Sequence, residues 1–351
     1  MSELFDGVLE RGPVREAVSD AAWLRAMLDA EAALARARGL DELAGAIAGA
    51  ALDPAALGRE AAASGNPVVP LVAALRERLG DEVHRGATSQ DILDTASMLV
   101  ARGALGPLCD DLGGAADAAA RLAAEHRATP IAGRTLMQHA VPTTFGLKAA
   151  GWMAALDTST AALRAIRFAA QLGGPAGTLA DEELVARYAG DLDLDAPVLP
   201  WHTDRTRIAA LATALGMACG AVAKVAGDVV LLAQTEVGEV HEAAPGGSSS
   251  MPHKRNPVAA ISARACARQA PGLVGTLLAA MEHEHERAAG AWHAEWRPLR
   301  ELLVATGSAA AWLRTCLQGL QVDPARMRAN LTTPADPADA AALTDRALHR
   351  R

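Results

Sequence analysis

The feature that most restricts the fold is a long apolar repeat over residues 208–242. Its apolar side chains recur at helical spacing on one stripe, at Ile208, Leu211, Leu215, Cys219, Val222, Val229 and Leu232. About 35 residues, each rising ~1.5 Å, would make a helix of roughly 50 Å. Because so long a helix with little charge needs apolar neighbours along its length, the repeat predicts a bundle of several long helices.

The composition favours an all-α fold of this kind. The 351 residues are 51% hydrophobic but only 3% aromatic, and alanine and leucine dominate. Strands favour β-branched and aromatic residues, whereas alanine and leucine favour helices. Besides 208–242, we expect helices at 20–39 (capped by Ser19 or Asp20), 71–79, 89–103, 108–126, 143–172 and 258–288, the last kinked at Pro271. Residues 1–18 are expected to form an irregular arm.

These elements divide the chain into three expected regions. Residues 1–103 would form an N-terminal helical domain, and residues 104–318 a central long-helix bundle that carries a serine-rich loop at 245–257. Residues 319–351 would be a short C-terminal remnant with turns around its prolines.

The net charge and the absence of targeting signals argue against a nucleic-acid-binding, secreted or membrane-spanning protein. The net charge of −8 argues against non-specific binding to nucleic acid. The first six residues lack the basic and apolar segments of a signal peptide, and the best candidate for a membrane span, 136–156, is interrupted by His139, Pro142 and Lys148. A cytoplasmic protein is therefore expected. The four cysteines lack metal or redox spacing, so we expect small buried side chains at Cys109, Cys219, Cys266 and Cys316.

The serine-rich loop concentrates groups suited to chemistry on carboxylates. Residues 246–257 read Gly-Gly-Ser-Ser-Ser-Met-Pro-His-Lys-Arg-Asn-Pro, a composition that disfavours a helix until Pro257 opens one. The loop offers hydroxyls, free backbone N–H groups and two fixed cations, Lys254 and Arg255. These groups suit a substrate with several carboxylates and a developing oxyanion.

Gly247 to Asn256 match the pattern G-S-S-x-M-P-x-K-x-N at every fixed position. The chain thus resembles the fumarase/aspartase superfamily. The resemblance implies a bundle of the fumarase/aspartase type, with the family's C-terminal helical domain truncated here. It also implies a homotetramer whose sites each combine regions from three chains. In the implied reaction a bond is made or broken β to a carboxylate, and Ser249 carries the α-carbon proton.

Further stretches resemble one branch of the superfamily, the 3-carboxy-cis,cis-muconate cycloisomerases. They are 84–91 with Thr-Ser-Gln-Asp, 133–142, 200–203 and 290–296. The lyase branches characteristically carry histidine after Thr135 to deliver a proton to the leaving group, whereas this chain has Leu136. A lactonisation needs no such histidine, because the attacking carboxylate is already ionised near neutral pH. The implied reaction closes 3-carboxy-cis,cis-muconate to a carboxymuconolactone, in the protocatechuate branch of the β-ketoadipate pathway.

The resemblance also implies a set of residues that bind the substrate. Besides Ser249, they are Thr88, Ser89, Gln90, Thr135, Gln138, His139, His202, Arg205, Ser248, Met251, Lys254 and Asn256. For His139 and His202 a purely structural, hydrogen-bonded role stays open. No cofactor motif is present, and no metal is expected. Glu282-His283-Glu284-His285-Glu286 is interpreted as a solvated helix face, because residues two apart point to different sides of a helix.

Three alternatives remain. Ser-Met-Pro-His-Lys-Arg-Asn-Pro also occurs in adenylosuccinate-type lyases, against which Leu136 argues. A cycloisomerase-like enzyme could act on another polycarboxylate, since pocket shape determines the substrate. A non-catalytic scaffold is the third, and the intact Ser249, Lys254 and Asn256 argue against it.

Overall fold

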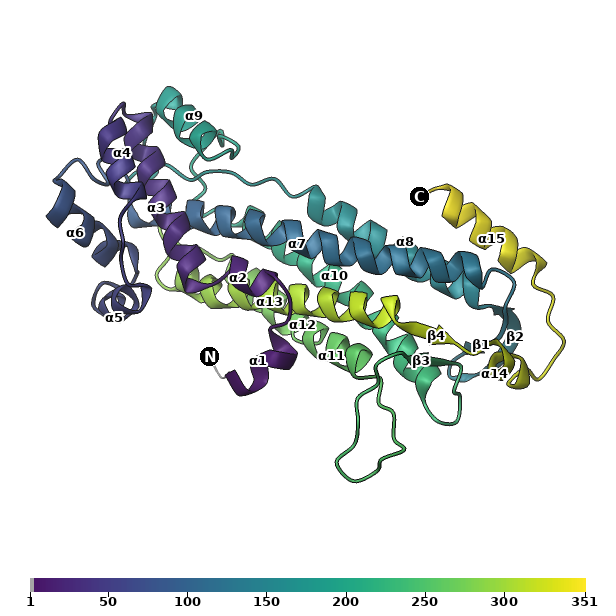
Figure 1. Ribbon diagram of the computed structural model, residues 1–351. Helices are drawn as coiled ribbons and strands as arrows, with labels where there is room; N and C mark the ends of the chain where they lie inside the picture. Colours follow the sequence, from purple (N-terminus) through teal and green to yellow (C-terminus); the bar gives the residue numbers. More distant parts are fainter. Residues whose placement is uncertain (1–2) are drawn as a thin grey trace.

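The longest helix, α7 (Ser89–Glu125), runs along most of the molecule (Figure 1). We describe residues 3–351 of a computed structural model. α7 begins with a capping box, in which Asp91 accepts the backbone N–H of Thr88. We predicted two helices here, separated near residues 104–107, and this was wrong: α7 continues through Pro107. The free energy gained by burying Ala104, Leu105 and Leu108 outweighs the cost of the helix-breaking residues between them.

Four further segments complete a bundle around α7. They are α8 (Phe145–Arg164), α10 (Thr206–Ala233), the pair α11 (Val258–Ala267) and α12 (Ala270–Ala279), and α13 (Ala291–Gln318). The break between α11 and α12 lies next to Pro271, where we expected a kink, although α12 ends at Ala279. The apolar stripe of α10 is buried, as its spacing predicted. The expected all-α, long-helix class is therefore confirmed, with two small two-stranded sheets added.

Two predicted helices are shorter than expected. α10 ends at Ala233 because the chain turns back, with Gly238 at a positive φ of 62° and the Glu239 N–H donating to the Leu232 carbonyl. The chain then forms β3 (Val240–Glu242), which pairs antiparallel with β4 (Leu320–Val322). α8 begins at Phe145, capped by Thr144, and ends at Arg164 rather than near 172.

One end of the molecule is built from short helices. They are α3 (Asp20–Ala37), α4 (Asp41–Ala48), α5 (Pro54–Ser64), α6 (Val68–Leu79) and α9 (Glu182–Asp191). Ser19 caps α3 as predicted, accepting the N–H of Ala22. Before it, the expected irregular arm is wrong for the described residues: α1 (Glu3–Leu9) and α2 (Val14–Ala17) form, with Val14 and Val18 buried and Trp312 donating to the Val8 carbonyl.

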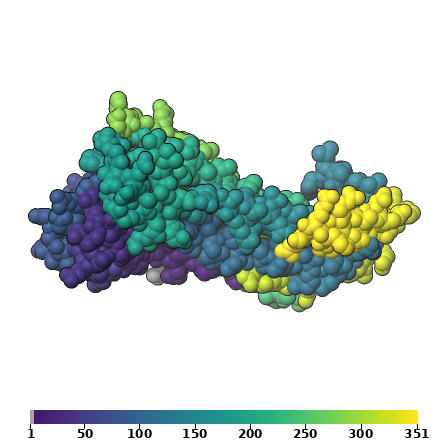
Figure 2. Space-filling view, turned by 90° about the horizontal axis from the view of Figure 1, so that it is seen from above, coloured from purple at the N-terminus to yellow at the C-terminus, as the bar shows by residue number. Residues whose placement is uncertain are grey.

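The opposite end carries a hairpin and the C-terminal helices. β1 (Pro130–Thr135) and β2 (Gln138–Thr144) pair antiparallel, near α14 (Pro324–Ala329) and α15 (Ala338–His349). Figure 2 shows the N-terminal helices and α15 at opposite ends of an elongated molecule. The predicted boundary at residue 103 falls inside α7, and the division into domains stays a prediction.

Among residues 3–351, two helices, α7 and α10, are long and apolar enough to cross a bilayer by length and composition. The segment at 136–156, which the sequence offered as the best candidate, is not among them. Of their most apolar windows, 72% and 56% of the residues are buried inside the structure. Core helices of a large bundle share this composition.

Candidate active site

Backbone hydrogen bonds close the base of the serine loop, which we call its neck. Gly246 and Asn256 form an antiparallel bridge, with N–H to carbonyl distances of 2.9 and 3.0 Å, and the Asn256 amide also donates to the Gly247 carbonyl at 3.0 Å. Just beyond the neck, the buried carboxylate of Glu242 accepts the N–H groups of Ala259 and Ala260 at 3.1 and 2.8 Å. The first turn of α11 is thereby tied to β3, so the loop projects from a rigid base.

Within the loop, the reactive groups are exposed. The Ser248 hydroxyl accepts the N–H groups of Ser250 and Met251 at 3.4 and 3.2 Å, which folds the loop into a turn. Ser249, Met251 and Lys254 are exposed, and within residues 3–351 no side chain is hydrogen-bonded to the Ser249 hydroxyl or the Lys254 ammonium. A serine hydroxyl needs neighbouring groups to transfer a proton, so these groups must come from outside the loop.

The N-terminus of α7 is held by one carboxylate. Asp91 accepts the Thr88 N–H, the N–H groups of Gly173 and Gly174, each at 2.9 Å, and the His202 Nε2 at 2.7 Å. Thr88 and Ser89 are half-buried at this positive end of the helix, where an anion is favoured.

Three other residues that were predicted to contact the substrate, Gln90, His202 and Arg205, are buried near the N-terminus of α7. The Gln90 amide donates to Asp94 and to the His202 carbonyl at 3.1 and 2.8 Å. Arg205 forms ion pairs with Asp94 at 2.7 Å and Glu295 at 2.6 Å. The structure thus places Gln90, His202 and Arg205 in a scaffold that joins α7, α10 and α13.

Sequence reasoning missed the acidic members of this scaffold and one histidine. The only local signal was the position of Asp91, three residues after the helix cap Thr88. His283 was expected on a solvated helix face, but residues 280–290 are irregular because α12 ends at Ala279. The His283 side chain is buried 3.4 Å from the Glu295 carboxylate, and burial lowers the pKa of its imidazole. Within residues 3–351, no group of three or more His, Cys, Asp or Glu side chains is arranged to hold a metal ion.

The β1–β2 hairpin presents the second predicted region. Thr135 and Gln138 are paired across a two-residue turn, and Leu136 and Met137 in that turn have positive φ values of 50° and 64°. Leu136 is 95% exposed, and Thr135, Gln138 and His139 are exposed as well. Positive φ is costly for side chains of this size, and such strain is concentrated at functional sites.

Within one chain, the N-terminus of α7 lies far from the hairpin. α7 has 37 residues, so its ends are separated by roughly 55 Å. Thr88 and Ser89 lie at one end, the hairpin follows the other end, and the serine loop projects from the side of the bundle (Figure 1). A single chain therefore does not bring all three regions together.

A glycine in the hairpin gives a direct test of its geometry. A Cβ added at Gly133, at the bulge between Ala132 and Arg134, would lie 2.3 Å from the Val141 carbonyl oxygen. Gly133→Ala should therefore distort the hairpin and accelerate hydrogen exchange over residues 130–144, measured by mass spectrometry, at a cost of about 1–3 kcal/mol. Gly151→Ala is the matched control, because Gly151 lies in α8 with no atom within 4 Å of the added Cβ. Equal exchange in both variants would contradict the close approach.

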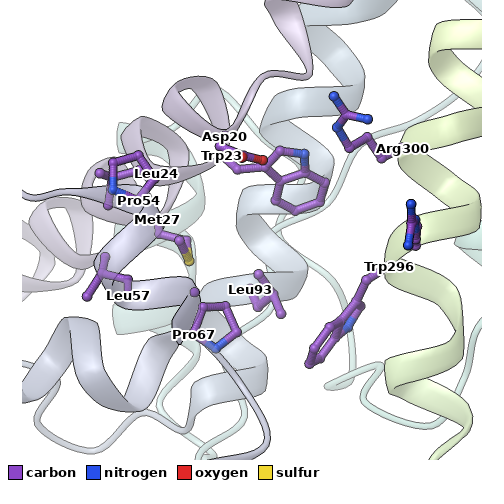
Figure 3. A pocket seen from close by; sticks show the side chains of 12 residues that line it. Asp20, Trp23, Leu24, Met27, Pro54, Leu57, Pro67, Leu93, Trp296 and Arg300 are labelled. Atoms are coloured by element: carbon purple, nitrogen blue, oxygen red, sulfur yellow. The ribbon is translucent and has the colours of Figure 1, made fainter. Parts of the chain in front are cut away.

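A separate cavity of about 340 Å³ lies among the N-terminal helices and α13 (Figure 3). Its lining is mostly apolar and includes Trp23, Met27, Leu57 and Trp296. None of the predicted site residues lines it, so it is distinct from the three regions described above.

The long-helix bundle with its exposed serine loop is the architecture of a helical enzyme of the lyase type. The chain belongs to the lyase family within the fumarase/aspartase superfamily, because residues 16–272 match the family model described as Lyase. The predicted superfamily and the resemblance to its cycloisomerase branch are confirmed.

Curated relatives and a solved structure extend over nearly the whole chain. A nitrosuccinate lyase from Streptomyces davaonensis is 48% identical, over 94% of this chain and 77% of the relative. A 3-carboxy-cis,cis-muconate cycloisomerase from Bradyrhizobium diazoefficiens is 45% identical, over 94% of this chain and 79% of the relative. The crystal structure of 3-carboxy-cis,cis-muconate lactonizing enzyme from Pseudomonas putida superimposes with a TM-score of 0.89 at 38% identity, covering 99% and 87% of the two chains.

Proposed function

We propose that the protein is a 3-carboxy-cis,cis-muconate cycloisomerase that acts in the cytoplasm, in the protocatechuate branch of the β-ketoadipate pathway. The observation that carries this proposal is the serine loop with its free hydroxyl and ammonium, combined with an apolar Leu136 where a lyase with a basic leaving group would need a proton-transferring side chain. Relatives with the same name at 45%, 44% and 42% identity support it.

The proposed reaction is an internal addition in which one C–O bond and one C–H bond form across the double bond, and the ionised substrate gains one proton. One carboxylate oxygen of the substrate attacks the double-bond carbon β to another carboxylate. The α-carbon takes a proton from the Ser249 hydroxyl, which is then reprotonated from solvent. Before protonation, charge accumulates on the carboxylate next to the α-carbon, where Lys254 and backbone N–H groups would stabilise it. Because nucleophile and acceptor share one molecule, holding the reactive conformer provides much of the rate.

The remaining carboxylates need anchors, and we propose Thr88, Ser89, Thr135, Gln138 and His139 for this role. All five side chains are at least partly exposed, which supports it. Gln90, His202 and Arg205 would act indirectly, by fixing the end of α7 on which Thr88 and Ser89 lie. Ser248 and Asn256 would shape the loop, through the hydrogen bonds described above.

The site is proposed to form only in a homotetramer, because in one chain Thr88 and Ser89 are separated from the hairpin by the length of α7, roughly 55 Å. The exposed apolar tip of the hairpin suits contact with another copy. Mixing two inactive variants, Ser249→Ala and Thr135→Ala, should restore part of the activity, since hybrid assemblies contain some sites with neither substitution. Light scattering should show four chains. No recovery in proven hybrids would contradict shared sites.

Nitrosuccinate lyase activity is the second candidate, favoured by the 48% identity to an enzyme of that name. A lyase acting on nitrosuccinate would remove the proton next to a carboxylate and release nitrite, leaving an alkene. Nitrite is weakly basic and leaves without being protonated, so Leu136 is compatible with this reaction too. The residue that argues against lyases with basic leaving groups therefore does not distinguish these two candidates.

One protein preparation assayed on both substrates decides between them. Closure of 3-carboxy-cis,cis-muconate destroys a conjugated diene, so ultraviolet absorbance falls, whereas nitrosuccinate turnover is measured as released nitrite. We expect kcat/KM to be at least about 100-fold higher for the muconate, a difference of roughly 2.7 kcal/mol in the barrier. The reverse ratio would establish the lyase. Cleavage of adenylosuccinate, run in parallel, would overturn the interpretation of Leu136, and inactivity on all three would point to another polycarboxylate or a scaffold.

A further inference from the structure

A cleft of about 610 Å³ lies between the hairpin, α8 and the end of α10. Leu136, Met137 and His139 line it from the hairpin, and Lys148 lines it from α8. Lys148 belongs to none of the three sequence regions that define the proposed site. Its position beside the strained turn places a cation next to proposed substrate anchors.

The other strong charges along the cleft already have partners. Arg134 binds both carboxylate oxygens of Glu239, at 3.0 and 2.7 Å, and Asn330 donates to the same carboxylate at 2.8 Å. Asp228 accepts the Trp152 indole N–H at 2.7 Å and pairs with Lys224. Arg134 therefore neutralises Glu239, and Lys224 neutralises Asp228.

Lys148 is the exception. Within residues 3–351 its ammonium forms neither an ion pair nor a hydrogen bond, and the other acidic residue of the cleft, Glu236, is exposed at the rim. Burial lowers the pKa of the Lys148 ammonium, and the nearby Asp228 only opposes this effect. A half-buried cation without a counterion is unfavourable, and such groups gather where a ligand supplies the missing charge.

We propose that Lys148 binds a carboxylate of the polycarboxylate substrate in this cleft. The inference rests on the proposed function for its substrate class, but the cleft and its unpaired charge stand independently. An ion pair present in both the bound substrate and the transition state lowers KM more than it raises kcat. Lys148 would therefore anchor the substrate rather than transfer its proton.

Direct binding of tricarballylate, an unreactive tricarboxylate, provides the test. Calorimetry on the assembled protein at fixed ionic strength should show saturable binding that weakens at least tenfold in Lys148→Met and is largely kept in Lys148→Arg. Arg167→Met is the matched control, because Arg167 is an exposed cation outside the cleft lining and paired with Asp195, and it should change affinity less than twofold. Ser249→Ala should also bind normally, because that hydroxyl is not a carboxylate anchor.

A measurement on the unsubstituted protein covers the case in which Lys148→Met misfolds. Tricarballylate should slow acetylation of Lys148 by acetic anhydride, followed by mass spectrometry, and leave acetylation of Lys224 unchanged. The proposal would be overturned if tricarballylate did not bind. It would also be overturned if tricarballylate bound Lys148→Met with unchanged affinity and did not slow acetylation of Lys148.

The two proposals fail in different ways. If neither muconate nor nitrosuccinate is turned over but tricarballylate binding depends on Lys148, the reaction is wrong and the site stands. If the muconate is turned over with a KM and a tricarballylate affinity that are unchanged in Lys148→Met, the reaction stands and the site is wrong.

Discussion

Replacing Ser249 with alanine should lower kcat for lactone formation by about 10³- to 10⁴-fold, the upper part of the range for a lost proton-transfer group. The substitution removes the only proposed group that can deliver a proton to the α-carbon, while Lys254 and the α7 terminus still bind the carboxylates. KM should therefore change less than about threefold, since binding energy common to substrate and transition state is kept. The fall in diene absorbance under saturating substrate measures the effect.

Ser250→Ala is the matched control for this prediction. Ser250 is the adjacent residue in the same exposed turn, and its backbone N–H, which the substitution keeps, makes the hydrogen bond to Ser248. Its kcat should stay within twofold of the unsubstituted protein. If Ser249→Ala kept more than a tenth of kcat, the proton would have to come from another group, and the assignment of the serine loop would be wrong.

The sequence predicted those features that depend on residues close together in the chain. The stripe on α10, the cap at Ser19 and the exposed loop around Ser249 each follow from local spacing or composition, and the structure contains all three. The break expected before Leu108 failed because local propensity was weighed without the packing energy of the bundle. Each buried side chain along α7 adds about 1.5–3 kcal/mol for a residue such as leucine. Several of them together exceed the cost of a glycine, roughly 1 kcal/mol, and that of Pro107, roughly 3 kcal/mol.

Contacts between distant residues could not be predicted in the same way. Arg205 and Glu295 are 90 residues apart, and Arg205 and Asp94 are 111 apart. Nothing in their local sequence distinguishes a buried ion pair from a substrate anchor, so Arg205 was assigned to substrate binding by the family resemblance alone. His283 was misjudged for a related reason, because its burial depends on where α12 ends rather than on its own segment.

The Arg205 cluster is the most heavily charged part of the interior. Arg205 donates to both oxygens of Asp94 and of Glu295, and Trp292 adds an indole N–H to Asp94 at 3.0 Å. Burial raises the pKa of Glu295, and Arg205 opposes that shift by pairing with its ionised form. Removing the guanidinium would leave two carboxylates buried without their cation.

Arg205→Met should therefore destabilise the protein by about 3–5 kcal/mol, the cost of breaking a buried ion pair from one side. Urea unfolding at equal protein concentration measures the change in the free energy of unfolding. Arg167→Met provides the contrast, because Arg167 makes the same two-point contact with Asp195 on an exposed surface, and its loss should shift the urea midpoint far less than the loss of Arg205. A stable Arg205→Met variant with a raised KM would instead make Arg205 a substrate anchor, as the family resemblance first indicated. We expect the loss of stability, because the geometry leaves Arg205 no donor free to reach a ligand: all three of its guanidinium nitrogens already donate to Asp94 or Glu295.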